Sequence, residues 1–346
     1  MEYHGRALIG PPSAFTALVF KFVALLGKAH EALLTTSKDR TDPVAPDMPE
    51  HVVLMQFPSP SAIEGIREGW LHPVLLVPHP YSAVAEAMQA KPTHLRDVLR
   101  TLSASAVANL AIGSCPTARL VVEDPAKRTD DALREVVAAL NLDIPEAAIA
   151  AALQACCAKE GLAASLAAAS GTSGQAGELS ADDQKIVAEA LFPIVYFAFG
   201  HVGMPVNWPT LLLLDADNPG NTAPAVIDVT GPARNILYGP YLHLPPADYD
   251  AEIMIRFSDW LDDVPFVLGV YAKDCLAEVR LQPQRAGTYG GSFPISVGDP
   301  CEAIEIRLRS EKGAIEGDLS MLGLSFRLKD AAAPLVVDQR GAAYTR

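Results

Sequence analysis

The first residues with chemical potential form a short turn of sequence GPPSAFT at positions 10–16. An apolar run enters the turn and a helix-forming apolar stretch, residues 18–26, leaves it. A strand, turn and helix in this order direct the first N–H groups of the helix toward an anion. The turn has no Lys or Arg, and Phe15 stands where phosphate-binding loops usually need glycine. The pattern fits an anion site, a former anion site or an ordinary turn.

Two further places carry side chains suited to acid–base work. His79 follows a predicted strand at its carboxyl end, where open α/β sheets place their ligands. It is the candidate catalytic base, although a surface or capping histidine is the favoured interpretation. Glu123 and Asp124 could act as a base or hold a metal, but a structural role is favoured.

Aromatic residues in the second half of the chain point to sugar binding. Tyr238, Tyr241 and Trp260 lie at predicted bends and strand ends, where aromatic faces could stack on sugar rings. The alternative is that each ring fills a protein core, and for any single ring this is favoured.

Asp259, Asp262 and Asp263 could bind Ca²⁺ in a loop, but a solvated acidic turn is favoured. The adjacent Cys156 and Cys157 have a poor geometry for zinc, so no metal site is predicted.

The elements that must position these residues change character along the chain. Up to about residue 200, short apolar runs alternate with helical patterns, which predicts a parallel sheet covered by helices on both faces. The expected strands are Ala7–Gly10, His51–Gln56, Val74–Val77 and Arg119–Val122.

After Trp208, Pro and Gly separate eight short β-rich runs, which is typical of an all-β sandwich or jelly roll. The sequence therefore predicts an α/β domain over 1–204, a linker over 205–224 and a β-sandwich over 225–330. A C-terminal tail over 331–346 completes the expected organisation.

The composition excludes several classes of protein. The chain has 346 residues, half of them hydrophobic, and a formal net charge of −14, which argues against nucleic acid and anionic lipid as partners. Its five cysteines are an odd number without a CxxC pair, which favours reduced thiols. No signal peptide or membrane span is evident, so the expected protein is soluble and cytoplasmic.

The first half resembles the bacterial sulfotransferase family, whose donor is 3′-phosphoadenosine 5′-phosphosulfate (PAPS). That family opens with a strand and a P-loop-like turn of the form G-x-P-R-S-G-T-[ST]-x-L. Gly10, Pro12 and Thr16 match this motif, while Ser13 replaces its arginine and Phe15 its glycine. The resemblance identifies Gly10, Pro12, Ser13 and Thr16 as the remains of a donor-binding loop.

Other landmarks of the family follow in the same order over roughly residues 5–200. Pro58 is retained from a strand ending in K-D-P-R. At the next strand end, where the family's Arg and Ser hold the 3′-phosphate, Pro78 replaces the arginine and Glu86 stands near the serine. The runs at 120–125 and 179–183 resemble a V-x-Y-E-D-L strand and an L-S-x-E-D helix start.

The resemblance implies a sulfotransferase-like protein whose donor-site cations are missing. Sulfuryl transfer needs cations or many N–H donors to hold negative charge in the transition state, so the favoured hypothesis is a pseudoenzyme. One alternative is an active carbohydrate sulfotransferase that binds PAPS through Lys21, Arg6 or Arg119. The other is a non-enzymatic scaffold or binding protein.

The run from Gly239 to Glu252 resembles the start of sandwich modules attached to bacterial polysaccharide-assembly proteins. This implies a place in surface-polysaccharide biosynthesis, with a glycan or glycan-assembly proteins as partners. Whether the chain forms a homo-oligomer stays open. No cofactor follows from the residues, and PAPS is implied only for an active enzyme.

Overall fold

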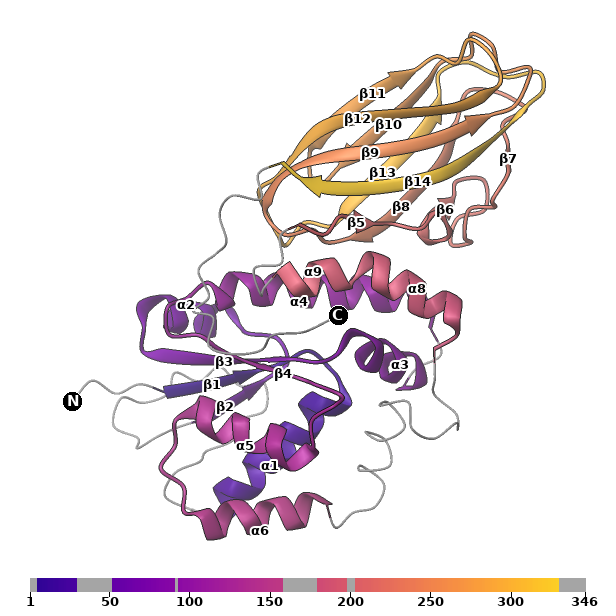
Figure 1. Cartoon of the computed structure of the whole chain (residues 1–346). Helices are drawn as coiled ribbons and strands as arrows, with labels where there is room; N and C mark the ends of the chain where they lie inside the picture. The colour runs from indigo at the N-terminus through magenta and orange to yellow at the C-terminus, as the bar shows by residue number, and fades with distance from the viewer. Residues whose placement is uncertain (1–4, 30–51, 91–92, 158–178, 198–202, 330–346) are drawn as a thin grey trace. The chain divides into compact units, whose positions relative to one another are not determined.

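The computed structural model describes residues 5–29, 52–90, 93–157, 179–197 and 203–329 (Figure 1). The chain forms two compact units. The first comprises the described residues up to Thr93 and those within Asn109–Ala181, and the second comprises His94–Ala108 and the described residues from Asp182 onward. The boundaries expected at 204 and 225 stay a prediction, and the predicted tail lies outside the described residues.

The first unit contains a four-stranded sheet in the order β2-β1-β3-β4, with every pair parallel. The strands are β1 (Gly5–Ile9), β2 (Val52–Met55), β3 (Leu71–Val77) and β4 (Arg119–Val122). In register, Leu8 pairs with Leu54 and with Val74. The predicted parallel α/β sheet is confirmed.

Helices cover both faces of this sheet, as the two-residue period of its strands requires. Leu8 and Val74 join one buried cluster with α1 (Ala14–Ala29), α5 (Thr129–Leu140) and α6 (Glu146–Cys157). Ala7 and Ile9 point to the opposite face and pack with α2 (Pro60–Glu68). Helix α3 (Pro80–Ala90) also belongs to this unit, whereas α4 (Leu95–Gly113) belongs to it only from Asn109 onward.

The second unit is built on two antiparallel sheets, in the orders β11-β10-β13-β8-β6 and β12-β9-β14-β5, with β7 paired to β14. The Phe257 and Phe266 rings, 5.0 Å apart, join the two sheets across the core. Burial alternates along β9, as expected for a strand with one face in a core. The predicted all-β sandwich is confirmed.

The strands of this unit are β5 (Val206–Asn207), β6 (Leu214–Asp215), β7 (Ile227–Asp228), β8 (Asn235–Leu242), β9 (Ala247–Phe257), β10 (Phe266–Tyr271), β11 (Cys275–Leu281), β12 (Gly287–Val297), β13 (Ile304–Ser310) and β14 (Asp318–Leu328). The short helices α8 (Ala181–Ala190), α9 (Phe192–Phe197) and η1 (Thr210–Leu212) precede most of them. In the described part of the chain, no helix has both the length and the apolar character needed to cross a membrane.

Candidate functional site

The turn after β1 is closed by its own side chains. Ser13 caps α1: its Oγ accepts a hydrogen bond from the Thr16 N–H at 3.0 Å and donates one to Thr16 Oγ1 at 3.0 Å. Both residues are buried. A Cβ on Gly10 would lie 2.7 Å from Thr16 Oγ1, so only glycine fits there. The structure thus brings Gly10, Ser13 and Thr16 together, while Pro12 is exposed beside them.

Phe15 does not enter this turn. Its side chain is only 3% exposed and belongs to the hydrophobic cluster that α1 forms with α5 and α6. The residue that differs most from a phosphate-binding loop therefore acts as part of the core.

A carboxylate of the chain itself lies at the N-terminus of α1. The Ala14 N–H donates to Oε2 of Glu86, which lies on α3. Burial raises the pKa of Glu86, and the hydrogen bond from Ala14 opposes this rise. The first amides of a helix have no partners within the helix and attract anions. Here Glu86 supplies the negative charge that such a helix end attracts.

A second carboxylate lies at the start of α3. Glu123 follows β4 and is 8% exposed, and its Oε2 accepts a hydrogen bond from the His79 N–H at 2.7 Å. The Ser82 side chain also bonds to it. Burial raises the pKa of Glu123 to about 7, and the charge of Glu86 contributes to this rise. In the structure, the Glu123 carboxylate accepts a hydrogen bond from the backbone just before α3, which is a contact of structural type.

His79 lies between β3 and α3, with its ring edge-on to Tyr81 at 5.3 Å. Burial lowers the pKa of His79, which Asp124 partly opposes. Its imidazole is therefore mainly neutral at pH 7, as a general base requires. It shares the carboxyl edge of the sheet with Glu123 and with the turn after β1, since all four strands are parallel.

The cations considered for a divergent donor site lie elsewhere. Arg6 and Arg119 are at the amino-terminal parts of β1 and β4, and the Arg6 Nε donates to the Leu140 carbonyl at 2.9 Å. Lys21 lies seven residues beyond Ala14, about 10 Å along the helix axis at 1.5 Å per residue. None of the three stands at the turn, where the N–H groups of Gly10, Ala14 and Thr16 already have partners within the chain.

In the second unit, two of the three predicted sugar-binding aromatics lie together. The Tyr238 and Tyr241 rings are 6.2 Å apart on β8. The Tyr241 hydroxyl donates to Glu305 at 2.8 Å, and the Arg100 guanidinium lies over its ring at 4.9 Å. Tyr241 is thus already engaged within this unit, whereas Trp260 is 73% exposed in the loop between β9 and β10.

A pocket of 580 Å³ lies on the polar face of the sheet that contains β8, β13 and β10. We call it the arginine pocket; its lining includes Arg234, Tyr238, Tyr271, Glu305, Arg307 and Arg309. Of the three aromatic residues selected as sugar-binding, Tyr238 lines this pocket, whereas Tyr241 and Trp260 do not. The alternation in the run Glu305-Ile306-Arg307-Leu308-Arg309 was the sequence signal, because it places three charged side chains on one face.

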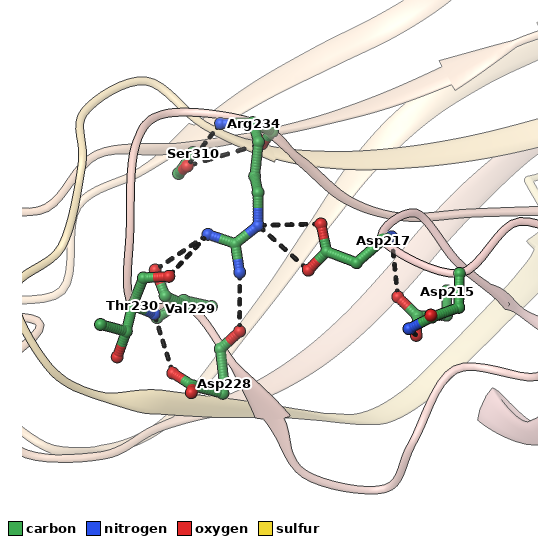
Figure 2. A network of polar contacts seen from close by, with 8 residues as sticks. Asp215, Asp217, Asp228, Val229, Thr230, Arg234 and Ser310 are labelled. Carbon is green, nitrogen blue, oxygen red and sulfur yellow. Dashed lines mark hydrogen bonds and ion pairs between the residues drawn. The ribbon is translucent and has the colours of Figure 1, made fainter.

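Arg234, which lines this pocket together with Asp217, is the centre of the network of polar contacts that Figure 2 shows. Its Nε lies 3.1 Å from both carboxylate oxygens of Asp217. The two terminal nitrogens donate to the backbone carbonyls of Asp228, Val229 and Thr230 at 2.9–3.2 Å. Ser310 Oγ accepts from the Arg234 N–H at 3.1 Å. Within the described residues, no three His, Cys, Asp or Glu side chains gather where they could hold a metal ion.

Comparison with known proteins gives no match to this chain in sequence. No protein-family model matches it, and no curated protein matches. Mouse sulfotransferase SULT7A1 in complex with PAP is 10% identical over 44% of this chain and 64% of that chain, with a TM-score of 0.33. The chain therefore spans less than two thirds of that protein.

Two other solved structures are similarly distant. TmCBM61 in complex with β-1,4-galactotriose is 13% identical over 30% of this chain and 83% of that one, with a TM-score of 0.22. The Gap123 glycosylation-associated complex from Streptococcus agalactiae is 9% identical over 87% of this chain and 50% of that one, with a TM-score of 0.23. At these scores, none of the likenesses supports a statement about activity.

Proposed function

We propose that this chain is a non-catalytic, sulfotransferase-like protein of surface-polysaccharide biosynthesis whose β-sandwich binds a glycan. One observation carries the non-catalytic part of the proposal: Glu86 and Glu123 accept hydrogen bonds from backbone N–H groups at the starts of α1 and α3. In the sulfotransferase motifs that the sequence resembles, the corresponding loops hold the 5′-phosphosulfate and the 3′-phosphate. Here each loop carries a carboxylate of the protein.

Electrostatics makes this arrangement unfavourable for PAPS. A phosphate group that approached the Ala14 amide would have to displace Glu86 and remain close to Glu123. An ionised Glu86 and the phosphate repel each other, and partial burial strengthens the repulsion. Glu123, whose pKa is raised to about 7, is about half ionised at neutral pH and adds a smaller repulsion. Arg6, Arg119 and Lys21 do not stand at this edge to offset it, so neither donor affinity nor stabilisation of a departing group is expected.

The second unit supports a binding role. Its arginine pocket combines hydroxyl, guanidinium and aromatic groups on a rigid sheet. A volume of 580 Å³ is within the range of small-molecule sites and large enough for a sugar residue.

Calorimetric titration of the full chain with 3′-phosphoadenosine 5′-phosphate tests the non-catalytic part. No heat of binding is expected up to millimolar nucleotide, in a buffer free of phosphate and sulfate. A sulfotransferase with an intact donor loop serves as the positive control. Saturable micromolar binding would overturn the proposal in favour of an active enzyme with a divergent donor site.

A further inference from the structure

The arginine pocket is built from outward-facing side chains of neighbouring strands. In register, Tyr238 on β8 pairs with Arg307 on β13, and Arg307 pairs with Gly269 on β10. Their sequence neighbours Leu237, Ile306 and Leu308 are completely buried. The hydrophobic core therefore fixes the backbone beneath the pocket, and the polar side chains extend from a rigid sheet.

The carboxylates of the pocket are already bonded. Glu305 Oε1 accepts from the Tyr241 hydroxyl at 2.8 Å, and its Oε2 accepts from Arg307 Nη2 at 2.6 Å. Both oxygens of Asp217 lie 3.1 Å from Arg234 Nε (Figure 2). Each of these four carboxylate oxygens therefore already has a partner within the chain.

Several hydrogen-bond donors of the pocket, in contrast, remain available to a ligand. Glu305 takes one of the five N–H groups of Arg307. The ion-pair partner of Arg309 is Glu278 at 3.8 Å, which is beyond hydrogen-bond length. Among the described residues, the Tyr238 hydroxyl has no hydrogen-bond partner. The lining contains three arginines and two carboxylates, and the Glu278 ion pair offsets the third arginine, so the surplus is one of N–H donors rather than of positive charge.

Tyr271 holds one of these arginines in place. A Cβ on Gly269 would lie 2.4 Å from Tyr271 Cε2, so the Tyr271 ring occupies the space that a side chain would take there. The Arg307 guanidinium lies over this ring, 4.6 Å from its centroid. A stacked guanidinium loses little further freedom when it binds a carboxylate or a similar oxyanion through two parallel hydrogen bonds.

From the surplus of donors and this preorganised arginine, we propose that the arginine pocket binds an anionic sugar residue of a glycan. Arg307 and Arg309 bind its acidic group, and Tyr238 contacts the ring and a hydroxyl. This inference rests on the proposed glycan-binding function and specifies the class of sugar. The acidic group is a carboxylate, as in a uronic acid, or a sulfate ester, because both present paired oxygens to a guanidinium.

Calorimetry on the full chain tests this with three oligosaccharides: an oligogalacturonate, a carrageenan oligosaccharide that carries only sulfate, and a neutral oligogalactose. Binding is expected for at least one of the two acidic ligands, it should weaken with added salt, and the neutral ligand should not bind. Whichever acidic ligand binds identifies the acidic group.

Two variants locate the site. Arg309→Gln should weaken binding about tenfold, since it removes a charge-assisted contact. The matched control is Arg256→Gln, an exposed arginine on β9 in the other sheet, which should leave the affinity unchanged within about twofold. Equal effects of the two substitutions would overturn the assignment to this pocket.

The remaining outcomes separate this inference from the function on which it rests. Binding of the neutral ligand as tightly as the acidic ones would overturn the anionic preference and leave glycan binding intact. Absence of binding to all three would overturn the pocket assignment, while the nucleotide titration would still decide whether the α/β unit is catalytic.

Discussion

The buried carboxyl of Glu123 should make the first unit lose stability as the pH rises. The ordinary pKa of a glutamate is 4.5, and burial raises that of Glu123 to about 7. Below pH 4.5 the group is protonated in the folded and unfolded states alike. Between 4.5 and about 7 the unfolded carboxyl has released its proton and the folded one retains it, so rising pH favours unfolding.

The size of the effect follows from the same two values. At 1.36 kcal/mol for each pH unit, a rise from 4.5 to about 7 corresponds to about 3 kcal/mol of unfolding free energy. The loss develops between those pH values and is complete above about pH 7. In Glu123→Gln the side chain is neutral throughout, and its amide oxygen can still accept the hydrogen bond from the His79 N–H.

The assay is hydrogen exchange in increasing urea, followed by mass spectrometry on peptides from β4 and α3 and corrected for the intrinsic exchange rate at each pH. From pH 4.5 to 8, Glu123→Gln should gain about 3 kcal/mol over the wild type in relative stability. Glu64→Gln, an exposed carboxylate on α2, is the control and should follow the wild type. If Glu123→Gln and the wild type show parallel pH dependences, the account of Glu123 as a buried carboxyl is refuted.

Two further substitutions test the turn and the pocket wall. Gly10→Ala should lower the unfolding free energy by about 1–3 kcal/mol, because its Cβ would lie 2.7 Å from Thr16 Oγ1. The control Gly113→Ala should not lower it, because its Cβ would meet Leu75 at an ordinary contact distance of 3.4 Å. Equal urea midpoints for the two variants would contradict the predicted clash between residue 10 and Thr16. Arg234→Lys should destabilise the loop over 215–230 by about 2 kcal/mol, because a lysine cannot reproduce the planar set of donors. Unchanged exchange protection of that loop would argue against its role.

The fold was predictable from periodicity, and the chemistry of its polar contacts was not. Alternating apolar runs are sufficient to predict a covered parallel sheet, because each strand must bury both faces. Two-residue strands such as β5 and β6 leave no periodic signal, so the sequence could not indicate them.

At the candidate sites, the limit was long-range pairing. Ser13 as a helix cap can be inferred from local sequence, because its partner Thr16 is three residues away. Glu86 lies 72 residues from Ala14 along the chain, and no local pattern connects them. Arg307 and Tyr271 likewise come from different strands, and only the register of β10 and β13 brings them into contact.

Helix α4 limits how the two units could be exchanged between proteins by recombination. Its residues up to Ala108 group with the second unit, whereas those from Asn109 onward group with the first. Neither unit is therefore one uninterrupted stretch of the coding sequence. Recombination within the segment encoding 205–224 would deliver β7 to β14 of the second unit without its helical residues 94–108. The two units are therefore expected to have been passed on together rather than exchanged as separate modules.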